Sequence, residues 1–406
     1  MTDKSEQKWI AGIDIGSTNI RCVIAVKDEP NAPIRIAGTS IQPSKGIKDG
    51  SVIDLAIASE SIREVITQAE SLAGTYIDEI IVGLNPRKIV SFDSYGVVPV
   101  KGDAVQEEDL ELLVDSTRDA KQISRKILHI LPQGFVLNRR QIRNPLGMTG
   151  KRLEGRFHLI TCTHTSVNHI VDAVQHADLD VVDILFSPIA SCAALLHKGN
   201  ISQRVCVIDF GGSATNFVLC KDGHVMKSGV VPYGGKSVTS DISQIFDVSP
   251  SSAERIKLAY SEDEKITEGK LSHLNEEEKN ILKDSKLAAV IEARVEEIFL
   301  DVKKELIQNG YLDEPTECLL TGGSSMTLGL LETVGNVLDL PVSIGSVAEI
   351  QSVTEDYKHP TFSSCVGLIL FSETFQDWRY FSPDNIHKSR PKGLFEKVLL
   401  YIKENM

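Results

Sequence analysis

Two short segments with the same pattern lie far apart in this chain and constrain its fold more than any other feature. They are Ile13 to Ile20 (IDIGSTNI) and Val207 to Phe217 (VIDFGGSATNF). In each, an apolar run reaches an aspartate, then glycine and small hydroxyl residues, then a second apolar run, which predicts a strand, a tight turn and another strand. Glycine allows such a turn to close its backbone N–H groups around an anion. The repetition therefore predicts duplicated halves that hold a nucleotide from both sides.

A third segment, Cys318 to Met326 (CLLTGGSSM), predicts a strand that runs into two glycines and is followed by leucines at helical spacing. Paired glycines at such a junction let the backbone approach a flat ring or a sugar closely. Asp14 and Asp209, each near the end of its strand, are suited to hold a hydrated divalent cation that bridges phosphates. The alternative is an ordinary α/β protein with three unrelated glycine turns, which the order of the three segments disfavours.

Composition limits the class of protein. The 406 residues are enough for two or three domains, and 42% hydrophobic with 24% charged residues indicates a buried core with a charged surface. The net charge of −13 lacks the basic footprint that nucleic-acid binding requires. The seven cysteines are scattered without CxxC pairs, which predicts reduced thiols in the cytoplasm. No apolar run approaches the roughly 20 residues that a membrane-spanning helix needs.

Other segments predict local structure. Residues 89 to 158 change in character and predict a small α+β insertion, with a helix that starts at the acidic residues Glu107 to Asp109. Ser249 and Pro250 predict the start of another helix. Apolar residues at three- and four-residue steps from Ile291 to Leu306 predict a long helix that ends at Gly310. The charge-rich segment Ser261 to Asp284 is expected to be exposed or irregular.

The last segment, Lys388 to Met406 (KSRPKGLFEKVLLYIKENM), reverses the charge of the chain, with five basic side chains against two acidic ones. Its apolar residues gather on one side of a helix, which predicts an amphipathic helix lying on an anionic membrane surface. The alternative is a helix packed on the protein's own core. The residues expected to contact the membrane are Leu394, Phe395, Lys397, Val398, Leu399 and Ile402.

These motifs, together with the stretches ILHILPQGF, NPLGMTGKRL, HLITC, VPYGGKSVTSDI, SAERIK and SSCVGLILF, resemble the FtsA family of bacterial actin-like cell-division proteins over nearly the whole chain. The phosphate motifs are shared with actin, MreB, sugar kinases and heat-shock chaperone ATPases, whereas the insertion and the tail are specific to this family. The resemblance implies an α/β fold with actin-like, duplicated ribonuclease-H-type lobes around a nucleotide cleft. A small α+β insertion (1C, SHS2-like) and a C-terminal amphipathic helix complete it.

The resemblance also implies a division of the chain into subdomains. The expected parts are subdomain 1A at residues 1–88 and 159–200, the 1C insertion at 89–158, subdomain 2A at 201–240 and 316–373, subdomain 2B at 241–315, a linker at 374–390 and the membrane-targeting helix at 391–406.

The cofactors implied by the resemblance are ATP and Mg²⁺, with the metal held through water by Asp14 and Asp209. The first phosphate loop would contain Asp14, Gly16, Ser17, Thr18 and Asn19, and the second Asp209, Gly211, Gly212 and Ser213. The nucleoside would be flanked by Glu254 and Lys257 and faced by Gly322, Gly323 and Ser324, with Gly235 and Met326 completing the cofactor-binding set.

Two departures from the family pattern bear on hydrolysis. Relatives often carry lysine where this chain has Asn19, and an acidic residue where it has Asn216, after the sequence Asp209-Phe-Gly-Gly-Ser-Ala. The second loop thereby lacks a hydroxyl and a carboxylate that could position water or metal. ATP binding with at most slow hydrolysis is the expectation.

In function, the resemblance implies a protein that polymerises at the cytoplasmic face of the inner membrane at the division site and tethers the FtsZ ring there. The FtsZ C-terminal tail would bind subdomain 2B, with Arg294 as a contact, and later division proteins would bind through 1C. Two alternatives stay open. An actin-like membrane scaffold of pilus assembly would not bind an FtsZ peptide. A small-molecule kinase of the same superfamily would need a catalytic carboxylate at an acceptor pocket and has no use for the tail.

Overall fold

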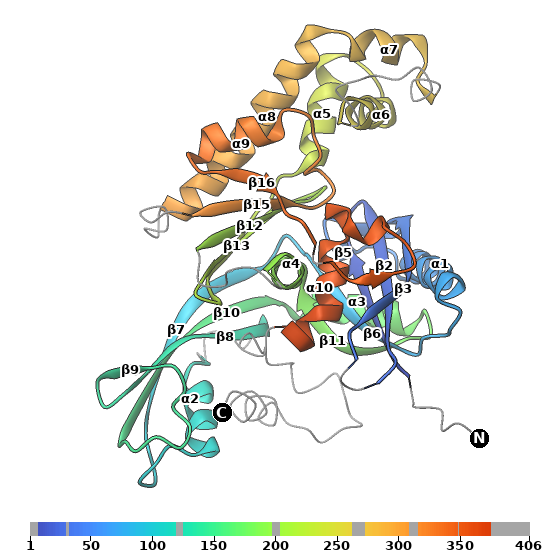
Figure 1. The fold of residues 1–406 in the computed structure, drawn as a ribbon. Coiled ribbons are helices and arrows are strands. Elements are labelled where there is room, and N and C mark those ends of the chain that lie inside the picture. Colours follow the sequence, from blue (N-terminus) through green and yellow to red (C-terminus); the bar gives the residue numbers. More distant parts are fainter. Residues whose placement is uncertain are drawn as a thin grey trace, which may run out of the picture.

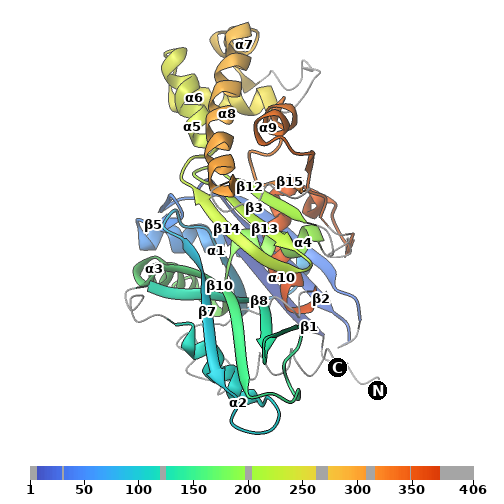
Figure 2. The same ribbon diagram turned by 90° about the vertical axis from the view of Figure 1, so that its left-hand side faces the viewer.

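The computed structural model describes residues 7–29, 32–118, 125–196, 204–261, 273–307, 316–347 and 349–374. Two α/β lobes lie next to each other (Figure 1). A small α+β unit extends from the first lobe, and a group of helices extends from the second at the opposite end of the molecule (Figures 1 and 2). The expected membrane helix, and the linker apart from Thr374, lie outside the described residues.

The first lobe is built on a six-stranded sheet of order β11-β6-β1-β2-β3-β17. The first three strands along the chain form an antiparallel meander, and β6 and β11 are added in parallel on the other side of β1. The centre of β2 is buried because helices cover both faces of the sheet. The bounds are β1 (Lys8–Ile15), β2 (Asn19–Lys27), β3 (Arg35–Pro43), β6 (Glu79–Leu84), β11 (Asp180–Phe186) and β17 (Gln351–Ser352).

The second lobe repeats this arrangement with a five-stranded sheet of order β14-β13-β12-β15-β16. Again the first three strands form an antiparallel meander, and two strands are added in parallel on the other side of the first. The duplication predicted from the two glycine-rich segments is therefore confirmed. The bounds are β12 (Val205–Phe210), β13 (Thr215–Lys221), β14 (His224–Val231), β15 (Glu317–Thr321) and β16 (Val342–Ile344).

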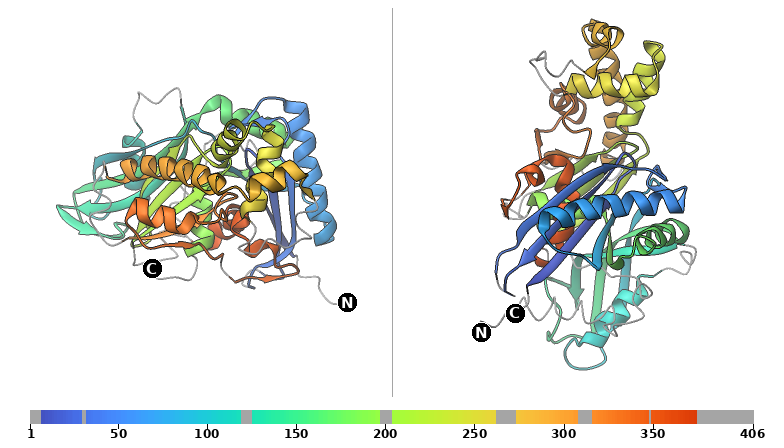
Figure 3. Two further views of the ribbon diagram at one scale, coloured as in Figure 1. Left: turned by 90° about the horizontal axis from the view of Figure 1, so that it is seen from above. Right: turned by 90° about the vertical axis from the view of Figure 1, so that its right-hand side faces the viewer.

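Helices α1 (Leu55–Ala73) and α3 (His164–Gln175) lie together on the outer face of the first sheet (Figure 3, right). On the inner face, α4 (Ser187–Leu196) and α10 (Ser363–Thr374) pack against each other where the lobes meet (Figure 1). This helix pair is unusually close, since a Cβ atom on Gly367 would lie 1.7 Å from the carbonyl oxygen of Ala190. Only glycine allows this approach.

The insertion has a four-stranded antiparallel sheet of order β7-β10-β8-β9 with α2 (Glu107–Ser116) packed on it. The predicted acidic start of this helix is confirmed, and Asp109 accepts a 2.9 Å hydrogen bond from the N–H of Gln106. Leu110 and Leu113 are buried in a separate small core with Phe157. The bounds are β7 (Val90–Pro99), β8 (Arg125–Leu137), β9 (Arg140–Ile142) and β10 (Arg152–Thr163).

The helical group lies between β14 and β15 in sequence. The long helix α8 (Ser285–Ile307) buries the predicted apolar positions and lies alongside α5 (Figure 3, left). One expectation is wrong in part: residues 276–282 of the charge-rich segment form α7 (Glu276–Leu282), because Asn275 and Glu278 cap its first turn reciprocally. The other helices between β14 and β15 are α5 (Gly235–Ile245) and α6 (Pro250–Ser261), and α9 (Leu330–Leu338), which follows β15, packs against α8.

Candidate functional site

The first glycine-rich turn connects β1 and β2, which pair last at Ile15 and Ile20. A Cβ atom on Gly16 would lie 2.6 Å from the carbonyl oxygen of Asn19, so this turn closes tightly only with glycine. Ser44 holds it from the end of β3. Its hydroxyl donates to the carbonyl of Gly16 at 2.6 Å, and its N–H donates to the carbonyl of Thr18 at 2.9 Å.

The second turn connects β12 and β13, and the N–H of Gly211 donates to the carbonyl of Ala214 at 3.1 Å. A Cβ atom on Gly212 would lie 2.2 Å from Oγ1 of Thr18 in the first turn. The two predicted phosphate loops therefore approach each other where the lobes meet.

Asp14 and Asp209 lie at the bases of these loops, each only 9% exposed. Asp14 accepts a 2.6 Å hydrogen bond from the hydroxyl of Ser187, at the start of α4. Burial raises the pKa of Asp209 to about 7, and the negative charge of Asp14 contributes to this rise, whereas Arg21 opposes it. A hydrated cation near both carboxylates would favour their charged forms.

Arg21 is a residue of this site that the sequence reasoning missed. It is the cross-strand partner of Asp14, and it is buried. Among the described residues its Nε atom has no hydrogen-bond partner. The signal was available in the sequence, because Arg21 is the one charged residue within the apolar run from Ile20 to Val26.

The third glycine-rich segment follows β15 and packs against the second loop. Gly322 has a φ of +95°, and a Cβ atom there would lie 2.2 Å from Oδ1 of Asp209. The N–H of Ser324 donates to the carbonyl of Phe210 at 2.9 Å, and a Cβ atom on Gly235 would lie 2.2 Å from the hydroxyl oxygen of Ser324. Gly323 lies next to the Arg21 guanidinium, and Met326 is exposed.

Glu254 and Lys257 lie together on α6, as their spacing predicts. The ammonium of Lys257 is 2.7 Å from Oε2 of Glu254, and it also donates to Oγ1 of Thr239 at 2.9 Å and to the carbonyl of Gly235 at 3.2 Å. Lys257 is buried by these contacts. The structure thus brings α6, the start of α5 and the third segment to one side of the second loop.

Several buried polar atoms at this site lack partners among the described residues. They are Nε of Arg21, the hydroxyl of Ser213 and both amide atoms of Asn216, the cross-strand neighbour of Asp209. Folded proteins leave few buried polar groups unsatisfied, so such a concentration indicates a place for ordered water or a polar ligand. Glycine-lined loops beside unsatisfied donors fit the phosphates of a nucleotide.

Two further cations, also missed from sequence, connect the lobes at the loops. Nε of Arg87, after β6, donates to the carbonyl of Ser213 at 3.0 Å. The ammonium of Lys236, on α5, donates to the carbonyl of Ser17 at 2.8 Å. Each loop is therefore contacted by a cation from the opposite lobe.

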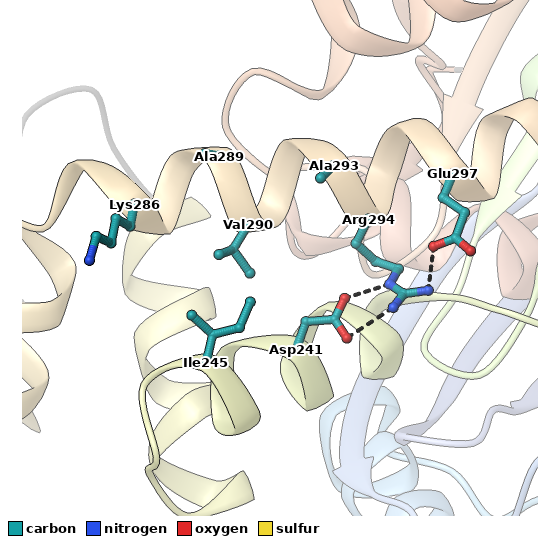
Figure 4. A pocket seen from close by; sticks show the side chains of 8 residues that line it. All are labelled: Asp241, Ile245, Lys286, Ala289, Val290, Ala293, Arg294 and Glu297. Carbon is teal, nitrogen blue, oxygen red and sulfur yellow. Dashed lines mark hydrogen bonds and ion pairs between the residues drawn. The ribbon is translucent and has the colours of Figure 1, made fainter.

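A separate groove of about 430 Å³ lies between α5 and α8 in the helical group (Figure 4). Ile245 and Val290 line its apolar part. Arg294 is held at one end by Asp241, with Nη2 to Oδ1 at 3.0 Å, and by Glu297 at 2.6 Å. The hydrogen bonds that Arg294 donates to Asp241, and the negative charges of Asp241 and Glu297, raise the pKa of Arg294.

The expected membrane-contact residues in the last segment lie outside the described residues. In the described ranges, no helix is both long enough and apolar enough to span a bilayer. No three or more His, Cys, Asp or Glu side chains in those ranges gather as a metal-binding group.

Comparison with known proteins identifies the family. A sequence profile described as "Cell division protein FtsA" matches residues 206–367, and one described as "SHS2 domain inserted in FTSA" matches residues 87–161. A cell division protein FtsA from Buchnera aphidicola is 31% identical, with 98% of this chain and 97% of that protein covered. The chain belongs to the FtsA family. FtsA proteins of Pseudomonas aeruginosa and Escherichia coli are 30% and 28% identical and cover 91% and 92% of the chain.

Solved structures agree with the fold. A chain of the "PilM-PilN type IV pilus biogenesis complex" superposes with a TM-score of 0.68 at 17% identity, covering 89% of this chain and 98% of that one. The ethanolamine utilization protein EutJ of Carboxydothermus hydrogenoformans gives 0.53 at 18% identity, covering 91% and 92%. At these identities the likeness shows the fold alone.

The expected fold class is confirmed for the two lobes and the SHS2 insertion. The FtsA relatives also confirm the predicted role as an actin-like cell-division protein and do not favour the pilus scaffold or the small-molecule kinase. An FtsA of this fold has a nucleotide-binding architecture and a role at the division site with other division proteins.

Proposed function

We propose that this FtsA binds ATP with Mg²⁺ between its lobes, with the phosphates between the turns at Gly16 and Gly212. The observation that carries this proposal is the concentration of unsatisfied buried polar atoms beside glycine-lined loops. Asp14 and Asp209 hold the hydrated metal, which supplies charge neutralisation when bound. Glu254, Lys257 and the Gly322–Ser324 segment flank the nucleoside. Because Asn216 replaces a carboxylate beside Asp209, hydrolysis is at most slow.

Substitution of Gly212 tests the nucleotide site. A valine there places its Cβ 2.2 Å from the Thr18 hydroxyl and obstructs the space between the loops. We expect Gly212→Val to lose ATP binding at least tenfold, measured by calorimetry with Mg²⁺ present. The matched control is Gly134→Val on β8, where a Cβ atom meets nothing within 4 Å. Equal affinity of the two variants would contradict the site.

The chain polymerises and attaches to the cytoplasmic face of the inner membrane through its last segment. Its apolar residues, Leu394 to Ile402, enter the lipid headgroup region, and its lysines contact anionic lipids. Each large apolar side chain contributes at most about 1.5–3 kcal/mol, so one tail binds reversibly and a polymer binds by avidity. Truncation before Pro391 should abolish co-sedimentation with phosphatidylglycerol vesicles, and unchanged pelleting would refute the tether.

The groove between α5 and α8 is the proposed binding site for the FtsZ C-terminal tail. It combines an apolar part at Ile245 and Val290 with a cation, Arg294, whose position Asp241 fixes. An extended peptide with apolar and acidic side chains would match both features. Later division proteins are proposed to bind the SHS2 insertion.

Peptide binding by fluorescence polarisation tests this groove. Arg294→Ala and Ile245→Asp should each weaken binding of an FtsZ C-terminal peptide about tenfold or more. The controls are Arg63→Ala, which removes an exposed arginine bonded to Asp178 on the first lobe, and Leu258→Asp on α6. If all four variants bind the peptide equally, the groove is not its site.

A further inference from the structure

Arg87 and Lys236 make reciprocal contacts across the junction of the lobes. Arg87 belongs to the first lobe and donates to the carbonyl of Ser213, in the loop of the second lobe, at 3.0 Å. Lys236 belongs to the second lobe and donates to the carbonyl of Ser17, in the loop of the first lobe, at 2.8 Å. Both cations therefore reach the region where the two loops approach each other.

Arg87 is held in position by a small hairpin of β4 (Ile47–Lys48) and β5 (Ser51–Val52). Its turn residues Asp49 and Gly50 have φ values of 52° and 71°, as a tight two-residue hairpin turn requires. A Cβ atom on Gly50 would lie 2.3 Å from the carbonyl oxygen of Asn85, so the turn packs directly on the segment before Arg87. Oδ2 of Asp49 then lies 3.2 Å from Nη1 of Arg87 and orients its guanidinium.

Lys236 is anchored to the second loop through its backbone, since its N–H donates to the carbonyl of Gly212 at 2.8 Å. Among the described residues, no carboxylate lies within ion-pair distance of its ammonium. Partial burial lowers the pKa of Lys236, and the positive charges of Arg87 and Lys257 contribute, although Asp49 and Glu254 act in the opposite direction. Asp49 therefore pairs with Arg87, whereas the ammonium of Lys236 has only a backbone carbonyl as its acceptor within the part of the chain that the structure describes.

Ser213 supplies independent evidence for a ligand at this point. The residue is only 3% exposed, and its hydroxyl has no hydrogen-bond partner among the described residues. It lies in the loop that Arg87 contacts. A buried, unsatisfied hydroxyl next to two cations that donate to neutral backbone carbonyls fits an anion with several acceptor oxygens.

We propose that Arg87 and Lys236 bind the terminal phosphate of a nucleoside triphosphate held between the loops, and thereby distinguish triphosphate from diphosphate. This inference rests on the proposed function. The backbone carbonyls that the cations now contact are neutral acceptors, whereas phosphate oxygens are charged and form stronger hydrogen bonds. A group between the loop tips can reach both cations, and the nucleoside is expected beside α6. A diphosphate has no third phosphate group, so nothing in it would replace the carbonyls of Ser213 and Ser17 as the acceptors of the two cations.

The test compares ATP and ADP affinities of the full chain by calorimetry with Mg²⁺. Lys236→Met and Arg87→Met should each weaken ATP binding about tenfold or more while changing ADP affinity less than about threefold. Lys303→Met is the matched control for lysine, because Lys303 donates to the carbonyl of Val337 at 2.8 Å far from the loops. Arg63→Met is the control for arginine, since Arg63 donates to the carbonyl of His176 at 2.8 Å.

The ratio of ATP to ADP affinity decides the outcome. A reduced ratio in both cleft variants, with an unchanged ratio in both controls, supports the inference. Equal losses of ATP and ADP affinity would overturn the inference but not the nucleotide site. The cations would then act only on closure of the lobes or on the phosphates that ATP and ADP have in common. If either methionine variant fails to fold, Lys236→Gln and Arg87→Gln, which also remove the positive charge, give the same readout. Failure of the unmodified chain to bind either nucleotide would refute the proposed function itself.

Discussion

The raised pKa of Asp209 has a measurable consequence for stability. Its carboxylate is buried beside Asp14, and both conditions disfavour its charged form. In the folded protein the group keeps its proton up to about pH 7, whereas the unfolded chain loses it near the ordinary value of 3.8. The folded state therefore binds more protons between these values, so stability must fall as pH rises through this window. Above pH 7 the full cost of the buried charge is present.

The magnitude follows from the size of the shift. A rise from 3.8 to about 7 is roughly three pKa units, which corresponds to about 4 kcal/mol of unfolding free energy at pH 8. At pH 5 the cost is only about 2 kcal/mol, because the folded carboxylate is still protonated. Asp209→Asn removes the titrating group and keeps its shape. The stability of this variant relative to the unmodified chain should therefore increase by about 3 kcal/mol from pH 5 to pH 8.

Urea unfolding at pH 5, 6, 7 and 8, without nucleotide or divalent cation, measures this difference. The matched control is Asp103→Asn, whose side chain is 99% exposed, and its stability relative to the unmodified chain should not depend on pH. Parallel pH dependence of the unmodified chain and Asp209→Asn would show that Asp209 does not titrate with a raised pKa. A bound Mg²⁺ would favour the ionised carboxylate, so Mg·ATP binding at pH 6 should release more protons from the unmodified chain than from Asp209→Asn, measured calorimetrically in buffers of different ionisation enthalpy.

Two further predictions concern other parts of the fold. Gly367→Ala should lower the free energy of unfolding by about 3 kcal/mol, because its Cβ would lie 1.7 Å from the carbonyl oxygen of Ala190 and force α10 from α4. Gly134→Ala, with open space at its Cβ, should change it by less than about 1 kcal/mol in urea unfolding. Burial lowers the pKa of His158, so the unfolded chain binds a proton below pH 6.5 that the folded chain does not, and stability should fall as pH drops through this range. From pH 7 to pH 5, the melting temperature of His158→Gln should therefore fall less than that of the unmodified chain.

The sequence predicted those features that short segments encode completely. Each hairpin carries its apolar strands, aspartate and glycines within a dozen residues, so the duplicated lobes and the two loops followed from pattern alone. The α7 helix was missed because its signal is a reciprocal cap between Asn275 and Glu278, which high charge density obscured. The cap residues themselves were visible in the chain.

The missed cations have a different cause. Lys236 reaches Ser17 across 219 positions of sequence, and Arg87 reaches Ser213 across 126. No local spacing connects such pairs, because the contact exists only after the two lobes have folded and come together. Arg21 was within reach of sequence reasoning, as an isolated charge in a buried strand. Its electrostatic interaction with Asp209, however, forms only once the second lobe has folded next to the first.

The contacts between the lobes also constrain how they can move. At one end the loops meet through Arg87 and Lys236. At the other end β14 packs against the insertion, where Nε2 of His158 lies 2.9 Å from the hydroxyl of Ser228, and Gln133 donates to the carbonyl of Met226 at 3.0 Å. Between them, α4 contacts strands of both sheets, β6 and β11 in the first lobe and β12 and β13 in the second. Rotation of the second lobe against the first would therefore break the hydrogen bonds between β14 and the insertion or carry the insertion along with β14.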